Sequence, residues 1–276
     1  RKCLHMPQNK LIEYYNNQLA TFRIHFTNTV NRQGVEDIHQ LRVFTKRIRT
    51  ILAIMEISSQ GEFRKKEHFH LFLEPFRLAG ELREIQLHLH LISAYESKYL
   101  APYKEYLIES QKQANENLLE GLARFDFENL EELNKVLLKK IENVTNEIAS
   151  KESRAYLLSK LKRVEELKDN INDDQKLHKI RIHLRAVMET LRLMNALEPS
   201  NEMRELKFQP KSLNDIIGKC HDQILLIASL ERFIQQSAHE RIIQYLSTLI
   251  NDLVNENSVA RKNINTLLVS YLSQTV

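Results

Sequence analysis

Glycine, proline and cysteine are scarce in this sequence, and tryptophan is absent. Five glycines and five prolines among 276 residues are too few for a fold rich in turns and short strands, which uses both residues heavily. The two cysteines, Cys3 and Cys220, form neither a disulfide framework nor a zinc ligand set, and their scarcity favours a reducing compartment. We therefore expect an all-α protein located in the cytoplasm.

Long hydrophobic runs are missing as well. No stretch reaches the roughly 18 uninterrupted apolar residues that a membrane-spanning helix needs. The first residues also lack the apolar core of a secretory signal. The sequence therefore predicts no membrane span, no secretory signal and no membrane partner.

One motif occurs twice, with the pattern H-x-[LI]-R-x-x-x-[KR]. On a helix of about 100° per residue, offsets of three and seven from the histidine fall within an arc of roughly 60°, so the basic side chains share a face. The net charge is only +4, so a surface that attracts anions has to come from such segregation of charge. The faces consist of His39, Arg42, Lys46 and Arg49 in the first copy, and of His178, Arg181, Arg185 and Arg192 in the second.

Each of these cationic stripes extends over three turns of helix, about 16 Å, which suits a chain of phosphates. Arginine offers a planar fork of donors and lysine a compact charge, and both match phosphate oxygens without reading bases. A single basic stretch is more often an ordinary solvated face, but the repetition favours an anionic ligand shared by the two copies. We expect the two histidines to orient or donate to that ligand.

A second marker, G-x-x-[RH]-[ED], follows each histidine at a similar distance. It begins at Gly80, 41 positions after His39, and at Gly218, 40 positions after His178. The copies of both patterns are therefore offset by 138 to 139 residues, which is about half the chain. This predicts an internal duplication with halves at residues 1–138 and 139–276, each a four-helix bundle, related by pseudo-symmetry around a central basic groove.

The second marker adds four candidate site residues. We expect Arg83 and His221 to reach the ligand directly, and Glu84 and Asp222 to hold the basic side chains in place. Ordinary surface ion pairing is the alternative interpretation of these four positions.

Apolar residues recur every three or four positions, which predicts amphipathic helices. We also expect one long helical run from about Glu128 to Asn170, followed by an N-cap at residues 172–174. The buried faces predicted for the first two helices consist of Leu11, Tyr14, Tyr15, Leu19, Phe22 and Phe26, and of Ile38, Leu41, Ile48, Ile51, Leu52 and Met55.

Other functions have weaker support. The pair His221 and Asp222 resembles a fragment of a metal-dependent phosphohydrolase, but no further His or Asp cluster with ligand spacing accompanies it. No nucleophile with a base and no glycine-rich phosphate loop is apparent, so we expect neither catalysis nor a cofactor. Nucleic acid is a rival ligand, although few aromatic residues interrupt the stripes for base stacking. A helical scaffold without a ligand is the remaining alternative.

These repeated motifs, in order and in register, resemble the CHAD family, the conserved histidine α-helical domain. The resemblance covers nearly the whole chain. It implies two pseudo-symmetric four-helix bundles that enclose a basic channel for inorganic polyphosphate, without known catalysis. Position by position, the residues that match the family's basic helices are His39, Arg42, Lys46 and Arg49, and then His178, Arg181 and Arg185.

The chain departs from the family pattern at several positions. Met188 and Glu189 stand where the family commonly has Arg followed by Tyr, which removes one cation from the second stripe and adds an acid. Arg192 could compensate for this loss. The resemblance implies polyphosphate as the partner, and it leaves open polyphosphate-metabolising enzymes, granule proteins and a location at polyphosphate granules.

Overall fold

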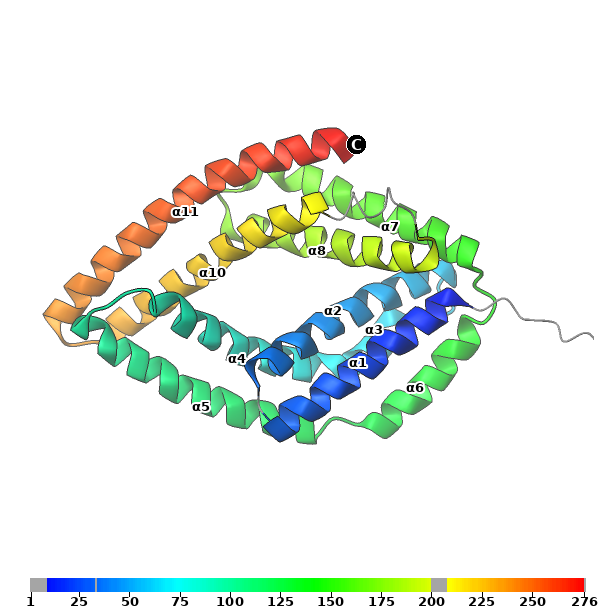
Figure 1. Ribbon diagram of the computed structural model, residues 1–276, viewed down its shortest axis with the longest axis horizontal. Coiled ribbons are helices and arrows are strands. Elements are labelled where there is room, and N and C mark those ends of the chain that lie inside the picture. Colours follow the sequence, from blue (N-terminus) through cyan, green and yellow to red (C-terminus); the bar gives the residue numbers. More distant parts are fainter. Residues whose placement is uncertain (1–8, 33, 200–207, 276) are drawn as a thin grey trace, which may run out of the picture. The chain divides into compact units, whose positions relative to one another are not determined.

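The computed structural model describes residues 9–32, 34–199 and 208–275, and within these ranges the regular structure is entirely helical (Figure 1). The all-α prediction is confirmed, and Cys3 lies outside the described residues. In chain order the helices are α1 (Lys10–Arg32), α2 (Val35–Ser58), α3 (Lys65–Phe69), η1 (His70–Phe72), α4 (Leu73–Ile92), η2 (Lys98–Leu100), α5 (Ala101–Ala123), α6 (Phe127–Lys140), α7 (Asn146–Leu167), η3 (Lys168–Asn170), α8 (Asp174–Leu197), α10 (Phe208–Gln236) and α11 (Glu240–Thr275). No described helix is long and apolar enough to cross a membrane.

The start of α8 agrees with the predicted cap. The side-chain oxygen Oδ1 of Asp173 accepts hydrogen bonds from the backbone N–H groups of Gln175 at 2.9 Å and Lys176 at 3.1 Å. These two N–H groups have no partner within the helix, so the carboxylate fixes where α8 begins. The motif that starts at His178 therefore lies in the second turn of this helix.

The predicted long run from Glu128 to Asn170 is wrong, because two helices and a short 3-10 turn occupy it. α6 ends at Lys140 and α7 begins at Asn146. Thr145 accounts for the interruption, since its hydroxyl accepts from the backbone N–H of Ile148 at 3.3 Å. Threonine competes for backbone groups in this way and favours a helix start over a helix interior.

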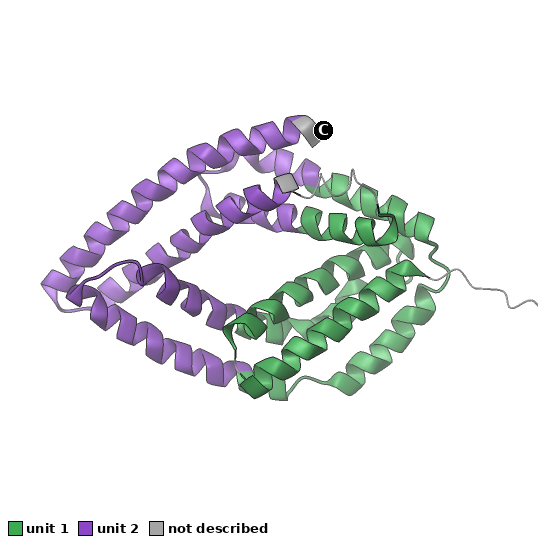
Figure 2. Ribbon diagram, viewed as in Figure 1, with its two compact units in different colours: residues 1–79, 119–160, 186–208 green, residues 80–118, 161–185, 209–276 purple. Residues whose placement is uncertain are grey.

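The described chain divides into two compact units that do not follow sequence order (Figure 2). Unit 1 contains residues 1–79, 119–160 and 186–208, and unit 2 contains residues 80–118, 161–185 and 209–276. The boundaries fall inside α4, α5, α7 and α8 and after the first residue of α10, so these helices contribute to both units. Compact units and sequence repeats are different properties, so the internal duplication stays a prediction.

Aromatic side chains fill much of the core of unit 1. The ring centroid of Phe22, which is fully buried, lies 5.1 Å from that of Phe72 and 6.0 Å from that of Phe125. The buried hydroxyl of Tyr15 donates to the side-chain oxygen of Asn134 at 2.6 Å, so both of these buried polar groups are satisfied. The apolar faces predicted for α1 and α2 point into this core, although Tyr14 is only partly buried.

Aliphatic side chains dominate the core of unit 2. Tyr103 is fully buried there, and its hydroxyl donates to the hydroxyl of Ser229 at 2.9 Å. This core joins α4, α5, α10 and α11 within the unit. Its buried members are Ile92, Leu100, Tyr103, Leu107, Leu226, Leu230, Leu246, Leu249 and Leu253.

Candidate functional site

In unit 1, aromatic rings support the cations of the first motif. The guanidinium of Arg42 lies 4.4 Å from the ring centroid of Phe76, and its Nη1 donates to the backbone oxygen of the same residue at 2.6 Å. The ammonium of Lys46 lies 5.6 Å from that ring, and the guanidinium of Arg49 lies 5.8 Å from the ring of Phe69. A ring face attracts a cation through its quadrupole, so these contacts hold like charges close together.

The remaining residue of this stripe, His39, is half-buried in the second turn of α2. The opposite side of α2 is buried, as the periodicity predicts, and Leu41, Ile48 and Leu52 have no exposed surface. Burial of that side fixes the rotation of the helix about its axis. It thereby determines which side chains of the motif remain within reach of solvent.

A third arginine of α2, which the motif does not contain, belongs to a separate charge cluster in unit 1. The Nε atom of Arg47 lies 3.3 Å from Oε2 of Glu189, and the guanidinium lies 4.5 Å from the ring centroid of Phe44. Arg192 donates from its Nη1 to Oε1 of the same carboxylate. The predicted ligand residue Arg192 is therefore engaged by an acid of its own helix.

In unit 2, the histidines of the second motif and second marker meet. Nδ1 of His178 lies 3.1 Å from Nε2 of His221, and the ring centroids are 4.5 Å apart. Burial and the nearby charges of Arg181, His178 and Arg185 together lower the pKa of His221 to about 4, and Asp174 opposes them. Because positive charge surrounds this ring, it stays neutral near pH 7 unless an anion is added.

The carboxylate of Asp222 in unit 2 pairs with one arginine and interacts electrostatically with two more. Nη1 of Arg181 lies 3.5 Å from Oδ1 of Asp222. Burial raises the pKa of the Asp222 carboxyl group, while Arg181, Arg185 and Arg83 oppose that rise. Arg83 and Asp222, which the second marker predicts, therefore lie in one cluster with Arg181 and Arg185 of the second motif.

Gly218 allows the guanidinium of Arg181 to lie directly on α10. A Cβ atom at this position would be 3.2 Å from Nη2 and 3.6 Å from Cζ of Arg181. The distance of 3.2 Å to Nη2 is shorter than an ordinary van der Waals contact, so a side chain at this position would shift the guanidinium. The isolated glycine of the second marker thus has a specific packing role beside the cluster.

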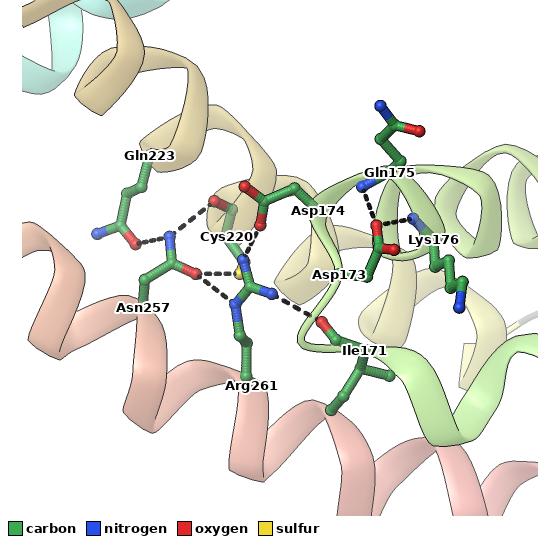
Figure 3. Close-up of polar contacts among 9 residues, drawn as sticks. All are labelled: Ile171, Asp173, Asp174, Gln175, Lys176, Cys220, Gln223, Asn257 and Arg261. Atoms are coloured by element: carbon green, nitrogen blue, oxygen red, sulfur yellow. Dashed lines mark hydrogen bonds and ion pairs between the residues drawn. The ribbon is translucent and has the colours of Figure 1, made fainter. Parts of the chain in front are cut away.

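A polar network in unit 2 holds together the segments that carry this cluster (Figure 3). The buried amide of Asn257 donates to the backbone oxygen of Cys220 at 3.0 Å and accepts from its thiol at 2.5 Å. Arg261 donates to the backbone oxygen of Ile171 at 2.8 Å and to the carboxylate of Asp174. Cys220 directly precedes His221 on α10, and Asp174 begins α8, so α11 holds two of the three helices that contribute to the cluster.

Within each compact unit, several of the residues predicted from the sequence lie close to one another. Unit 2 brings five of them together with Asp222, namely Arg83, His178, Arg181, Arg185 and His221. Glu84 lies near the buried Tyr103, whose pKa is raised to about 12 chiefly by burial and also by the charge of Glu84. Sequence reasoning missed Arg47 and the two supporting rings, Phe69 and Phe76, and no periodic pattern marks them.

The structure also bears on two alternatives, a metal site and a ligand pocket. Among the described residues there is no group of three or more His, Cys, Asp or Glu side chains that could hold a metal ion. A pocket of about 250 Å³ in unit 2 is lined by Asp169, Ile171, Asn172, Arg261, Lys262 and Asn265, and none of these is a predicted ligand residue. The basic groove expected from the sequence therefore stays a prediction.

Comparisons with known proteins agree with the fold. The family model of the CHAD domain matches residues 13–231. Similar solved structures include the crystal structure of the CHAD domain from the plant Ricinus communis, with 14% identity, coverage of 94% of this chain and 90% of that chain, and a TM-score of 0.76. They also include PptA from Streptomyces chartreusis, with 13% identity, coverage of 94% and 97%, and a TM-score of 0.67.

The comparison with curated proteins gave no match. At identities of 13% and 14% the likeness to solved structures concerns the fold alone. The family model is more specific, because it matches well over half of the chain and spans both H-x-x-R motifs and both glycine markers. This protein therefore belongs to the CHAD domain family.

Proposed function

We propose that this protein binds inorganic polyphosphate without catalysing a reaction on it. The observation that carries the proposal is the cluster of unit 2, where the charges of Arg83, Arg181 and Arg185 act on the carboxylate of Asp222 and the rings of His178 and His221 meet beside them. Half-buried cations that lie close together repel one another, and an anion that binds among them relieves that repulsion. The fork of each guanidinium suits the oxygens of a phosphoryl group.

The cations of α2 support the same ligand class and argue against nucleic acid. The ring of Phe76 is engaged by Arg42 and Lys46, and the buried ring of Phe69 by Arg49. Rings engaged in this way do not form an open platform on which bases stack. A polymer of phosphate alone requires only the charges, so polyphosphate fits this surface better than single-stranded DNA or RNA does.

Polyphosphate binding also suggests a cellular role. A non-catalytic module of this kind would place attached or associated proteins at polyphosphate granules, or would hold polyphosphate-metabolising enzymes near their substrate. Granule proteins and such enzymes are therefore the partners that we propose. A metal-dependent phosphohydrolase has no specific observation in its favour.

Removal of one motif charge from each unit tests the proposal. We expect Lys46→Gln combined with Arg185→Gln to weaken long-chain polyphosphate binding about tenfold, or about 1.4 kcal/mol, at fixed salt. Glutamine keeps much of each side chain and removes the charge, so the free energy of unfolding should change by no more than about 0.5 kcal/mol. Calorimetric titration and thermal melting measure the two effects.

The matched control removes the same charges outside the motifs. Lys135 and Arg163 form exposed ion pairs, and their side chains are 71% and 64% exposed. The combination of Lys135→Gln and Arg163→Gln should leave affinity nearly unchanged. An equal loss of affinity in the control would mean that total charge, and not the two motifs, governs binding.

Gly218→Ala should move stability and binding in opposite directions. Alanine inside α10 favours the helix by up to about 1 kcal/mol relative to glycine, so thermal stability should hold or rise. The added Cβ displaces the guanidinium of Arg181, so polyphosphate affinity should fall about threefold, which is about 0.65 kcal/mol. The same substitution in an Arg181→Gln background should have no further effect on affinity. An undiminished loss in that background would contradict this role of Gly218.

The pH dependence of binding follows from the lowered pKa of His221. In the free protein this pKa is about 4, because burial and the charges of Arg181, His178 and Arg185 disfavour the proton, while Asp174 opposes them. A bound polyanion favours the proton and raises the pKa, so the complex holds more protons than the free protein between the two pKa values. Affinity should therefore rise as the pH falls from about 7 to about 5.

His221→Gln is the variant that tests this linkage. The internal phosphates of a long polyphosphate stay ionised over this pH range, so the protein supplies the pH dependence. Calorimetric titrations at three pH values and constant salt should show a flatter profile for His221→Gln than for the unsubstituted protein. Parallel profiles would assign the pH dependence to other groups.

A further inference from the structure

Glu189 places a covered carboxylate between two arginines of unit 1. The residue is only 7% exposed, whereas the side chains of Arg47 and Arg192 are 22% and 34% exposed. Oε1 accepts from Arg192 and Oε2 lies 3.3 Å from Nε of Arg47. The phenol of Tyr14 borders the group, since burial raises its pKa, Glu189 raises it further, and both arginines oppose the rise. The carboxylate is thus buried behind two cations that solvent still reaches.

The position of Glu189 on α8 coincides with the basic stripe. It follows Arg185 by four residues and precedes Arg192 by three, which places all three side chains on the same side of the helix. The second motif would otherwise continue along this side as an unbroken row of cations. Glu189 instead places a negative charge between Arg185 and Arg192 and so interrupts the row of positive charge on α8.

We propose that Glu189 is an internal occupant of an anion site formed by Arg47 and Arg192. A carboxylate and a phosphoryl group offer oxygens to a guanidinium in the same way, so the two compete for one place. The carboxylate is tethered, and its effective concentration is in the millimolar range or above, so it excludes a phosphate of the polymer.

This inference rests on the proposed polyphosphate function and makes it more specific. Glu189 acts as a specificity residue that limits how many phosphates α8 binds. Polyphosphate engages Arg185, while Arg192 stays neutralised by its own helix. The chain therefore favours shorter phosphate polymers than a sequence with a neutral residue at position 189 would favour.

Glu189→Gln tests the inference by a gain of binding. Glutamine keeps the shape and one acceptor oxygen but removes the negative charge, which leaves both arginines available to the ligand. We expect the affinity for long-chain polyphosphate to rise about threefold to tenfold at about 150 mM salt. We also expect a steeper salt dependence, because the complex releases counterions from up to about two more phosphates.

The matched control is Glu132→Gln, which changes the net charge equally. Glu132 forms an exposed ion pair with Lys135 in the same unit, and its side chain is 70% exposed. This control should change neither affinity nor salt dependence. A rise in the control equal to that of Glu189→Gln would overturn the inference, because net charge alone would explain both.

A second variant addresses loss of folding, since removal of a buried charge can destabilise a protein. Arg192→Gln leaves Glu189 paired with Arg47, and it should change polyphosphate affinity less than about twofold, or about 0.4 kcal/mol. In a Glu189→Gln background the same substitution should remove much of the gained affinity. The inference would be overturned if Arg192→Gln alone weakened polyphosphate binding as much as Arg185→Gln does. Arg192 would then already bind the ligand in the unsubstituted protein.

The two proposals fail in different ways. If the unsubstituted protein binds polyphosphate and Arg185→Gln weakens it, but a folded Glu189→Gln variant binds no better, only the role of Glu189 is overturned. If neither the unsubstituted protein nor Glu189→Gln binds, both proposals are overturned.

Discussion

Repulsion between half-buried cations is the constraint that both candidate clusters have to overcome. In unit 2 the carboxylate of Asp222 stands among Arg83, Arg181 and Arg185, and in unit 1 Glu189 stands between Arg47 and Arg192. The carboxylate of Asp222 pairs with Arg181, whereas that of Glu189 contacts two arginines and is more completely covered. We therefore expect the local balance of charge, and not the number of basic residues, to decide where an anion binds.

The two motif helices hold their cations by different means. On α2, the rings of Phe76 and Phe69 contact the cationic groups of Arg42, Lys46 and Arg49. On α8, Arg181 lies against Gly218 and faces a carboxylate. An aromatic ring adds no negative charge beside the cation that it contacts, while a carboxylate positions a guanidinium and reduces the local net charge. Motifs with the same sequence pattern are thus embedded in different surroundings.

Sequence periodicity predicted the helical fold, the buried faces of α1 and α2, and the face shared by His178 and Arg181, because these features depend on the repeat of a single helix. The interruption between α6 and α7 was missed, since the cap by Thr145 is weak as a sequence signal. Arg47 lies about 100° from Lys46 on α2, so no stripe includes it, and only tertiary packing brings it to Glu189. Local sequence patterns also could not predict the two compact units, because each unit combines segments that are far apart in the sequence.

The most direct test of the central claim is a comparison of ligands on the unsubstituted protein. Long-chain polyphosphate and single-stranded DNA of matched total charge would be titrated at one salt concentration near 150 mM, because phosphate affinities depend steeply on salt. Our account predicts that polyphosphate binds at least about tenfold more tightly than the DNA. Equal affinities, or no binding of polyphosphate, would contradict the claim that the motif cations bind polyphosphate.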